Sequence, residues 1–115
     1  MKIKVKYIII VIIVLLLFSN CKRNTRNLKV KVVTTEEDKK LGLMFRQYLN
    51  MDEGMLFTFN YGNNTVWMKN TYIPLDVIFL DNDYIVIGYV EDTMPFSLDS
   101  VTIDKDSNHI LEVNS

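Results

Sequence analysis

Alternating polar and apolar residues open the domain and predict a strand followed by a helix. From Leu28 to Val33 lysines alternate with valines, the period of two that is typical of a half-buried strand. Residues 34–38 then supply a threonine cap followed by three acids, which favours a helix start. The predicted helix continues because one apolar face follows at helical spacing, formed by Leu41, Met44, Phe45 and Tyr48. Gly42 interrupts this face and indicates close packing against a neighbour.

After residue 53 the pattern predicts short strands. Residues 54–59 and 65–68 are two of them, on either side of a turn at 60–64. Residues 75–80 and 84–90 flank the turn Asp81-Asn82-Asp83 and predict a hairpin. The apolar run 77–80 indicates a strand covered on both faces. With two weaker strands at 100–103 and 109–113, the elements predict a single α+β domain: one main helix and a strongly curved or barrel-like sheet of six or seven strands.

The N-terminal residues have the pattern of a secretory signal. Three lysines within residues 1–6 precede an unbroken apolar run, 7–18, and then Ser19-Asn20-Cys21. We predict a lipoprotein signal peptide at 1–20, a lipidated Cys21 with a polar tether at 21–27, and the folded domain at 28–115. The alternative is an uncleaved membrane anchor, but twelve apolar residues are fewer than the ~20 that a spanning helix needs.

The net charge of the chain limits the classes of partner that it can bind. Without residues 1–20 the chain has ten basic and fourteen acidic residues, a net charge of −4. Nucleic-acid binding needs a basic face, so we expect no nucleic-acid partner. The 88 residues that remain after the tether are enough for one modest core.

Three motifs in fixed order carry a resemblance to a known family. They are Leu-Gly-Leu-Met-Phe-Arg at 41–46, Gly-Met-Leu-Phe-Thr-Phe at 54–59, and Val-Trp-Met-Lys-Asn-Thr-Tyr-Ile-Pro-Leu-Asp-Val-Ile-Phe at 66–79. The chain resembles the bacterial and archaeal "domain of unknown function 192" family from about residue 28 onward. The resemblance implies a compact α+β domain with a barrel-like sheet, exported and lipid-anchored relatives, and no established activity. Such relatives usually continue beyond the Leu-Glu-Val-Asn of 111–114 into further elements, so we expect either an open sheet edge here or a reduced, partly decayed member of the family.

The third motif supplies the candidate ligand site. Strand alternation places Trp67 and Lys69 on one face, where Asn70 and Thr71 follow them. With Arg46 and Asp76, these residues predict a cationic rim with an aromatic floor, suited to a small polar, anionic or sugar-like ligand. A structural interpretation is favoured over this ligand site: Asp76 pairs with Arg46 or Lys69, and the Asn70 amide and Thr71 hydroxyl hold the loop backbone.

The sequence patterns that would indicate an enzyme or a metal site are weaker than the pattern that indicates a ligand site. The glycines are too far apart for a phosphate loop, and Cys21 is committed to the anchor. His109, the single histidine, is expected in a solvated loop, with a Ser/His/Asp triad as the less favoured alternative. Methionine thioethers suit Cu(I), but core packing is the favoured explanation for the four candidates: Met44, Met55, Met68 and Met94. We expect no cofactor and no metal.

Together these patterns predict an exported lipoprotein on the periplasmic or outer side of a bacterial membrane. Its domain is expected to bind a small ligand or to act as a non-catalytic accessory. The alternative is an enzyme acting on a small polar or carbohydrate substrate in the cleft of Arg46, Trp67, Lys69 and Asp76.

Overall fold

The computed structural model describes residues 25–115. The predicted signal peptide (1–20), the predicted lipidation site Cys21 and the first residues of the tether lie outside the described residues. Within residues 25–115 no helix is long and apolar enough to cross a membrane.

The described chain is built on a five-stranded sheet. In spatial order it contains β1 (Lys29–Val33), β2 (Glu53–Gly62), β5 (Ser107–Asn114), β3 (Leu75–Leu80) and β4 (Val86–Val90). β1 and β2 are parallel, and every other pair is antiparallel. Since β1 and β4 are not paired with each other, the sheet is open, and the barrel-like closure expected from the sequence does not occur.

Both faces of the central strands are buried. In β3, Val77 and Phe79 belong to one apolar cluster, whereas Ile78 and Leu80 belong to a second cluster on the opposite face. Each of these four side chains is at most 3% exposed, which confirms the prediction that this strand is covered on both sides. β5 lies between β2 and β3 and contributes to both clusters in the same way.

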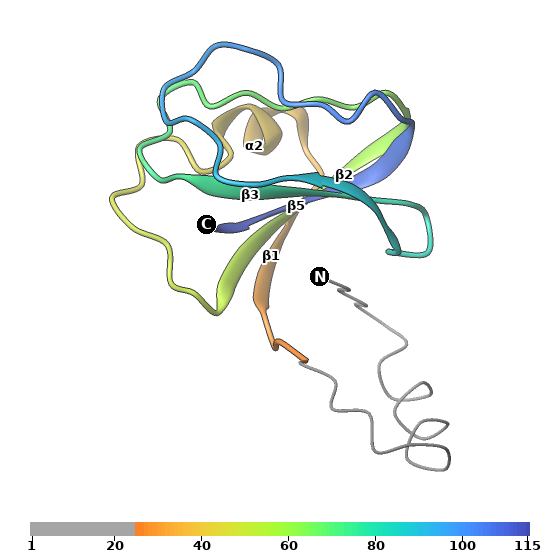
Figure 1. Ribbon diagram of the computed structural model, residues 1–115, viewed down its shortest axis with the longest axis horizontal. Coiled ribbons are helices and arrows are strands. Elements are labelled where there is room, and N and C mark those ends of the chain that lie inside the picture. Colours follow the sequence, from red (N-terminus) through yellow and green to blue (C-terminus); the bar gives the residue numbers. More distant parts are fainter. Residues whose placement is uncertain (1–24) are drawn as a thin grey trace.

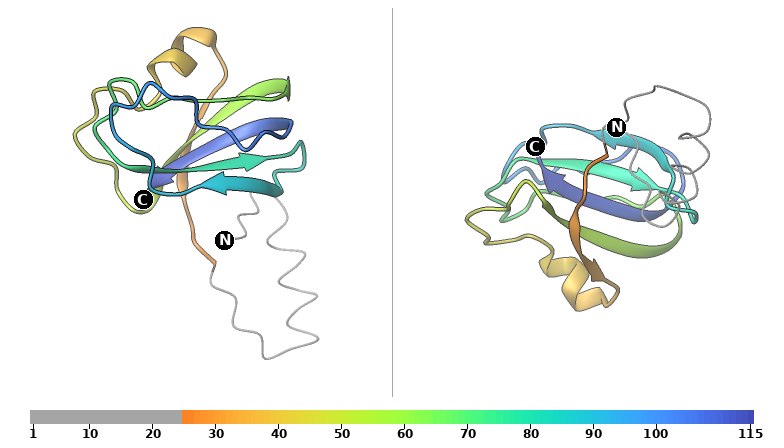
Figure 2. Two further views of the ribbon diagram at one scale, coloured as in Figure 1. Left: turned by 45° about the horizontal axis from the view of Figure 1, so that its top comes forward. Right: turned by 90° about the horizontal axis from the view of Figure 1, so that it is seen from below.

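The two faces are covered differently. α2 (Glu36–Leu41) and the loops that follow β2 and β4 pass along one side of the sheet (Figures 1 and 2). Loop residues such as Leu43, Met68 and Ile73 complete the cluster on that face. The second cluster is completed by residues in and next to the two edge strands, which indicates that the sheet curves round it; they are Leu28, Val30, Tyr84 and Val86.

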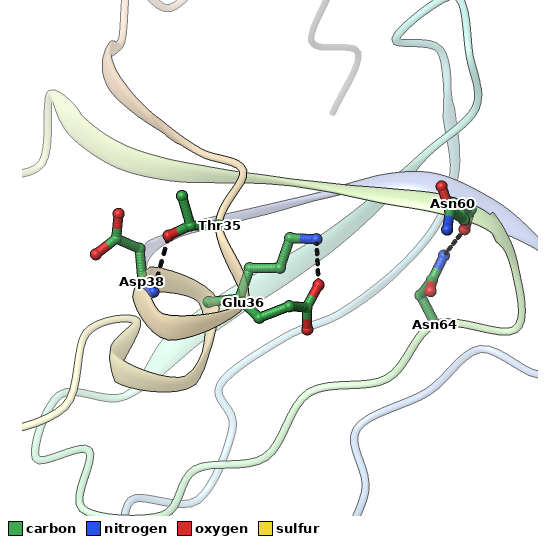
Figure 3. A network of polar contacts seen from close by, with 6 residues as sticks. Thr35, Glu36, Asp38, Asn60 and Asn64 are labelled. Carbon is green, nitrogen blue, oxygen red and sulfur yellow. Dashed lines mark hydrogen bonds and ion pairs between the residues drawn. The ribbon is translucent and has the colours of Figure 1, made fainter.

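The helix is shorter than predicted. Its start is as expected: the Thr35 hydroxyl caps it by accepting from the Asp38 amide at 3.2 Å (Figure 3). It ends at Gly42, which has a φ of +48°. The prediction of a helix reaching Tyr48 is wrong, because Phe45 also adopts a positive φ of 66°. The apolar face that suggested a longer helix is largely solvated, with Leu41 53% and Tyr48 75% exposed.

Two predicted strands are loops. The segments 65–68 and 100–103 meet only at a single antiparallel bridge between Val66 and Val101. The valines of both segments, Val66 and Val101, pack against the first cluster. The segments therefore cross a face of the sheet and do not extend the edge of the sheet. The expected six or seven strands are therefore five in the described part of the chain.

A loop amide fixes the end of β2 against β5. The Asn64 side chain donates to the carbonyl oxygen of Asn60 at 3.1 Å (Figure 3) and to that of Gly62 at 3.2 Å. It also donates to the Ser107 carbonyl at 2.8 Å, at the start of β5. These contacts occupy the stretch where the β2–β5 register is irregular, between Thr58 and Gly62.

Replacing Phe79 tests the doubly covered sheet. Phe79 is fully buried on β3, so Phe79→Ala should lower the free energy of unfolding by about 3–5 kcal/mol. The matched variant Tyr89→Ala removes an aromatic ring that is 53% exposed on the edge strand β4 and should cost less than about 1 kcal/mol. Urea unfolding of both variants measures the difference, and equal losses would contradict the assignment of the core.

Candidate functional site

A cavity of about 200 Å³ lies on the face of the sheet that carries α2. It is bounded by the end of α2 and the residues after it, by β2 and β5, and by the loop from Thr65 to Thr71; we name it the Glu112 cavity. Its lining residues are Glu36, Lys39, Lys40, Leu41, Gly42, Leu43, Met44, Phe57, Phe59, Thr65, Val66, Trp67, Thr71 and Glu112.

Glu112 is a buried acid at the centre of the sheet. It lies on β5, opposite Met55 of β2 and Val77 of β3, two side chains of the first apolar cluster. Cross-strand partners share a face, so the Glu112 side chain projects from the same face as these residues. Glu112 is only 4% exposed and yet lines the cavity, which places its carboxyl group against the cavity space.

The Glu112 carboxyl has no hydrogen-bond partner among residues 25–115. No donor of the described chain reaches it, and neither of the described ion pairs includes it. No enclosed polar side-chain atom of these residues lacks a partner, so the carboxyl oxygens are not sealed off. They must therefore retain contact with the cavity. Since buried polar groups in folded proteins are nearly always paired, the partner of this carboxyl has to come from the cavity.

Burial changes the protonation of Glu112. Desolvation disfavours the charged form and raises the pKa of the carboxyl from 4.5 to about 8. At neutral pH the group is therefore mainly a protonated acid. It can then donate one hydrogen bond and accept others.

Two lysines of α2 border the cavity and differ in their contacts. Lys39 Nζ lies 3.2 Å from Glu36 Oε1 and 4.8 Å from the centre of the Phe59 ring. Lys40 is exposed and has no ion-pair partner within residues 25–115. Of the two lysines that line the cavity, Lys39 is therefore compensated by an acid and Lys40 is not.

The third sequence motif contains residues that line the cavity and a residue that holds the loop in place. Trp67 and Thr71 line the cavity, and Lys69 Nζ lies 5.1 Å from the centre of the Trp67 ring. The Thr71 hydroxyl donates to the Lys69 carbonyl at 3.0 Å. Asn70 has a φ of 52°, and its carbonyl accepts from the Phe45 amide at 2.9 Å. Asn70 thus joins this loop to the segment after α2.

The structure does not bring Arg46 and Asp76 to the same cavity. Asp76 pairs in register with Val113 and so faces the second cluster, on the side of the sheet opposite Glu112. Its Oδ1 accepts from the Asp92 amide at 2.9 Å. Arg46 is exposed and does not line the cavity, and the two residues form no ion pair with each other.

His109 is not in a solvated loop, and that expectation was wrong. It lies within β5, is 6% exposed, and stacks on Tyr84 with ring centres 4.3 Å apart. Its Nδ1 lies 3.2 Å from the Thr58 hydroxyl. Burial lowers the pKa of His109, against a smaller opposing effect of Asp81. The ring contacts within the described part of the chain include no serine, so they give no support to a Ser/His/Asp triad. Packing accounts for the position of His109.

Sequence reasoning missed Glu112 and Lys40. A signal for Glu112 was present, because it interrupts the apolar run Ile110-Leu111-Glu112-Val113 of a strand whose neighbours are apolar on both faces. An acid in such a run must point into one of the two cores. Lys40 gives no comparable signal, since a lysine on a short helix is ordinarily a solvated residue.

Comparisons with known proteins place the chain among uncharacterised relatives. A family model described as "Uncharacterized ACR, COG1430" matches residues 19–115. A solved structure from Sinorhizobium meliloti 1021, provisionally called a transcription regulator, is 32% identical with a TM-score of 0.74, and the match covers 76% of this chain and 69% of that one. A protein of unknown function from Novosphingobium aromaticivorans DSM 12444 is also 32% identical, with a TM-score of 0.73 and coverage of 76% and 64%. The chain thus spans slightly less than two thirds of the second structure. No curated protein matches the chain.

The pH dependence of stability should report on Glu112. The unfolded chain releases the Glu112 proton near pH 4.5 and the folded chain near pH 8. The contribution of the protonated carboxyl to the free energy of unfolding is therefore complete below pH 4.5 and is lost as the pH rises to about 8. Within that window the free energy of unfolding should fall by up to about 1.4 kcal/mol per pH unit. Glu112→Gln should flatten the slope and be the more stable protein at pH 8. The exposed control Glu37→Gln should keep the wild-type slope; urea unfolding from pH 5 to 8 measures all three, and identical slopes would disprove the burial effect.

Proposed function

The chain belongs to the domain of unknown function 192 family, and from this premise we propose that its domain binds a small polar ligand in the Glu112 cavity. We further propose that the domain is held at the outer side of a bacterial membrane through lipid on Cys21. Such a protein acts as an envelope binding or accessory lipoprotein and needs no catalytic step.

One observation carries the ligand proposal. Glu112 is 4% exposed and lines the cavity, and its carboxyl forms no hydrogen bond with residues 25–115 while its oxygens stay open to the cavity. Because the carboxyl is open to the cavity, a ligand there can form a hydrogen bond that no group of the described chain provides, and a typical net hydrogen bond contributes about 0.5–1.5 kcal/mol. Ligand sites typically combine apolar walls with a few convergent polar groups, and this cavity has that composition.

The motif loop supports the same proposal. Trp67 lines the cavity and is 47% exposed, with the Lys69 ammonium 5.1 Å from the centre of its ring. The loop is fixed from two sides, because Phe45 donates to the Asn70 carbonyl and Phe96 donates to the Thr71 carbonyl at 3.2 Å. A wall held in this way is pre-organised, which lowers the entropic cost of binding.

A second candidate is an enzyme acting on a small polar or carbohydrate substrate. The observation that favours it is the pKa of Glu112, about 8, which suits a general acid or base near neutral pH. The two-carboxylate chemistry of many glycosidases would need a second acid, and Asp76 faces away from the cavity. Glu36 borders the cavity but pairs with Lys39. Binding without catalysis is therefore the better-supported function.

Nucleic-acid binding is not proposed. One similar structure is provisionally called a transcription regulator. The present chain has fourteen acidic and ten basic residues after position 20, so no excess of positive charge is available for a phosphate backbone.

A fragment screen followed by protein NMR tests the ligand site. Binders in a library of small polar molecules should shift the resonances of Glu112, Trp67 and Thr71, which line the cavity. Trp67→Ala should weaken them at least about fivefold, since an aromatic contact contributes about 1 kcal/mol or more. Tyr61→Ala removes a ring that is 70% exposed and does not line the cavity, and should leave affinity unchanged. Binders that shift only the separate depression around Asp76, Ile78 and Tyr89 would refute this site.

Substitution of Cys21 tests the anchor. In a bacterial host fed labelled fatty acid, the wild-type chain should incorporate the label and sediment with membranes. Cys21→Ser should lose both properties, because the chain then lacks its single thiol. A variant that stays in the membrane fraction without label would instead identify the apolar run 7–18 as an uncleaved anchor.

A further inference from the structure

We propose that the Glu112 cavity is specific for a small organic anion, a carboxylate with an apolar body, held between the Glu112 carboxyl and the Lys40 ammonium. This inference rests on the proposed function, since it names the class of ligand that the same cavity takes. It commits to the charge of the ligand, on which the family description is silent.

The charges around the cavity favour an anion. Besides Glu112, the titratable side chains that line it are Glu36, Lys39 and Lys40, all from α2. The strands and the loop that face Glu112 contribute only uncharged lining residues within the described chain. Glu36 and Lys39 neutralise each other at 3.2 Å, so the Lys40 charge remains. With Glu112 protonated, the cavity carries one net positive charge.

The hydrogen-bonding state of Glu112 favours the same ligand. A protonated carboxyl offers an O–H donor, and a carboxylate oxygen is the acceptor that makes the shortest and strongest bond with it. Burial raises the pKa of the group to about 8, so this donor is present at neutral pH. A cationic ligand would meet the Lys40 ammonium at the edge, and a neutral one would leave that charge unmatched.

The apolar walls of the cavity indicate what the body of the ligand, apart from its carboxylate, should be. Phe57, Phe59 and Trp67 provide aromatic surface, and Leu43 provides aliphatic surface. A volume of about 200 Å³ is below the usual range of cavities for drug-sized ligands. The body that fits is a single ring or a short hydrocarbon chain, with its carboxylate directed to Glu112 and Lys40.

Three probes of equal size and different charge test the class. Benzoate, benzamide and benzylamine share one ring, and at pH 7 they are anionic, neutral and cationic respectively. Isothermal titration calorimetry on the full-length chain should give benzoate an affinity at least about tenfold above the other two. Lys40→Gln should weaken benzoate about fivefold and leave benzamide unchanged. Lys105→Gln, at an exposed lysine outside the cavity, is the matched control and should change neither.

The pH dependence of binding separates Glu112 from a general charge effect. Because only the protonated carboxyl donates to the anion, benzoate should bind about tenfold more weakly at pH 9 than at pH 7. In Glu112→Gln the amide donor does not titrate, so the affinities at the two pH values should agree within about twofold.

The outcomes distinguish this inference from the proposed function. If benzamide or benzylamine binds in the cavity as tightly as benzoate, the anion class is wrong while ligand binding stands. If benzoate binds but its affinity does not change between pH 7 and 9, the role of protonated Glu112 is wrong. If none of the probes binds and the fragment screen yields no cavity binder, the proposed function fails together with the inference.

Discussion

The structure depends on one constraint: the central strands β3 and β5 have to be covered on both faces by a small chain. Helix and loops cover one face, and the curvature of the sheet covers the other. In β5 this leaves no solvated side on which a charge could be placed. Glu112 is therefore desolvated by the same packing that stabilises the sheet, and it keeps access only to the cavity under α2. Core and candidate site are thus consequences of a single arrangement.

The parts of the fold that depend on local pattern could be predicted. The Thr35 cap, strand β3 and its hairpin partner β4 follow from capping, apolar runs and turn residues. The failures are all tertiary. The apolar spacing from Leu41 to Tyr48 suggested a longer helix, but the chain turns at Gly42 to bring Leu43 and Leu49 into the core. Likewise, residues 65–68 and 100–103 have strand composition and yet cross a sheet face, where only one bridge forms. Strand order and closure depend on such long-range packing, which periodicity does not encode.

The candidate site was predictable only in part, for a related reason. Trp67 and Thr71, which were proposed from their motif, line the cavity. Asp76 belongs to the same motif, but two-residue alternation along β3 sends it to the opposite face. Glu112 lies 45 positions after Trp67 and shares no motif with it, so only the topology β2-β5-β3 brings the two together. Nearness in sequence was a poor guide to nearness in space.

The position of β5 has a consequence for the order of folding. It is the last strand in sequence, yet it lies between β2 and β3 and joins the β1–β2 pair to the β3–β4 hairpin. A chain emerging from its N-terminus therefore holds two half-sheets that cannot unite until residues 107–114 arrive. Because these contacts are distant in sequence, assembly should be late and cooperative. A chain that completes its fold late remains unfolded for longer during synthesis. The proposed export across a membrane requires an unfolded chain.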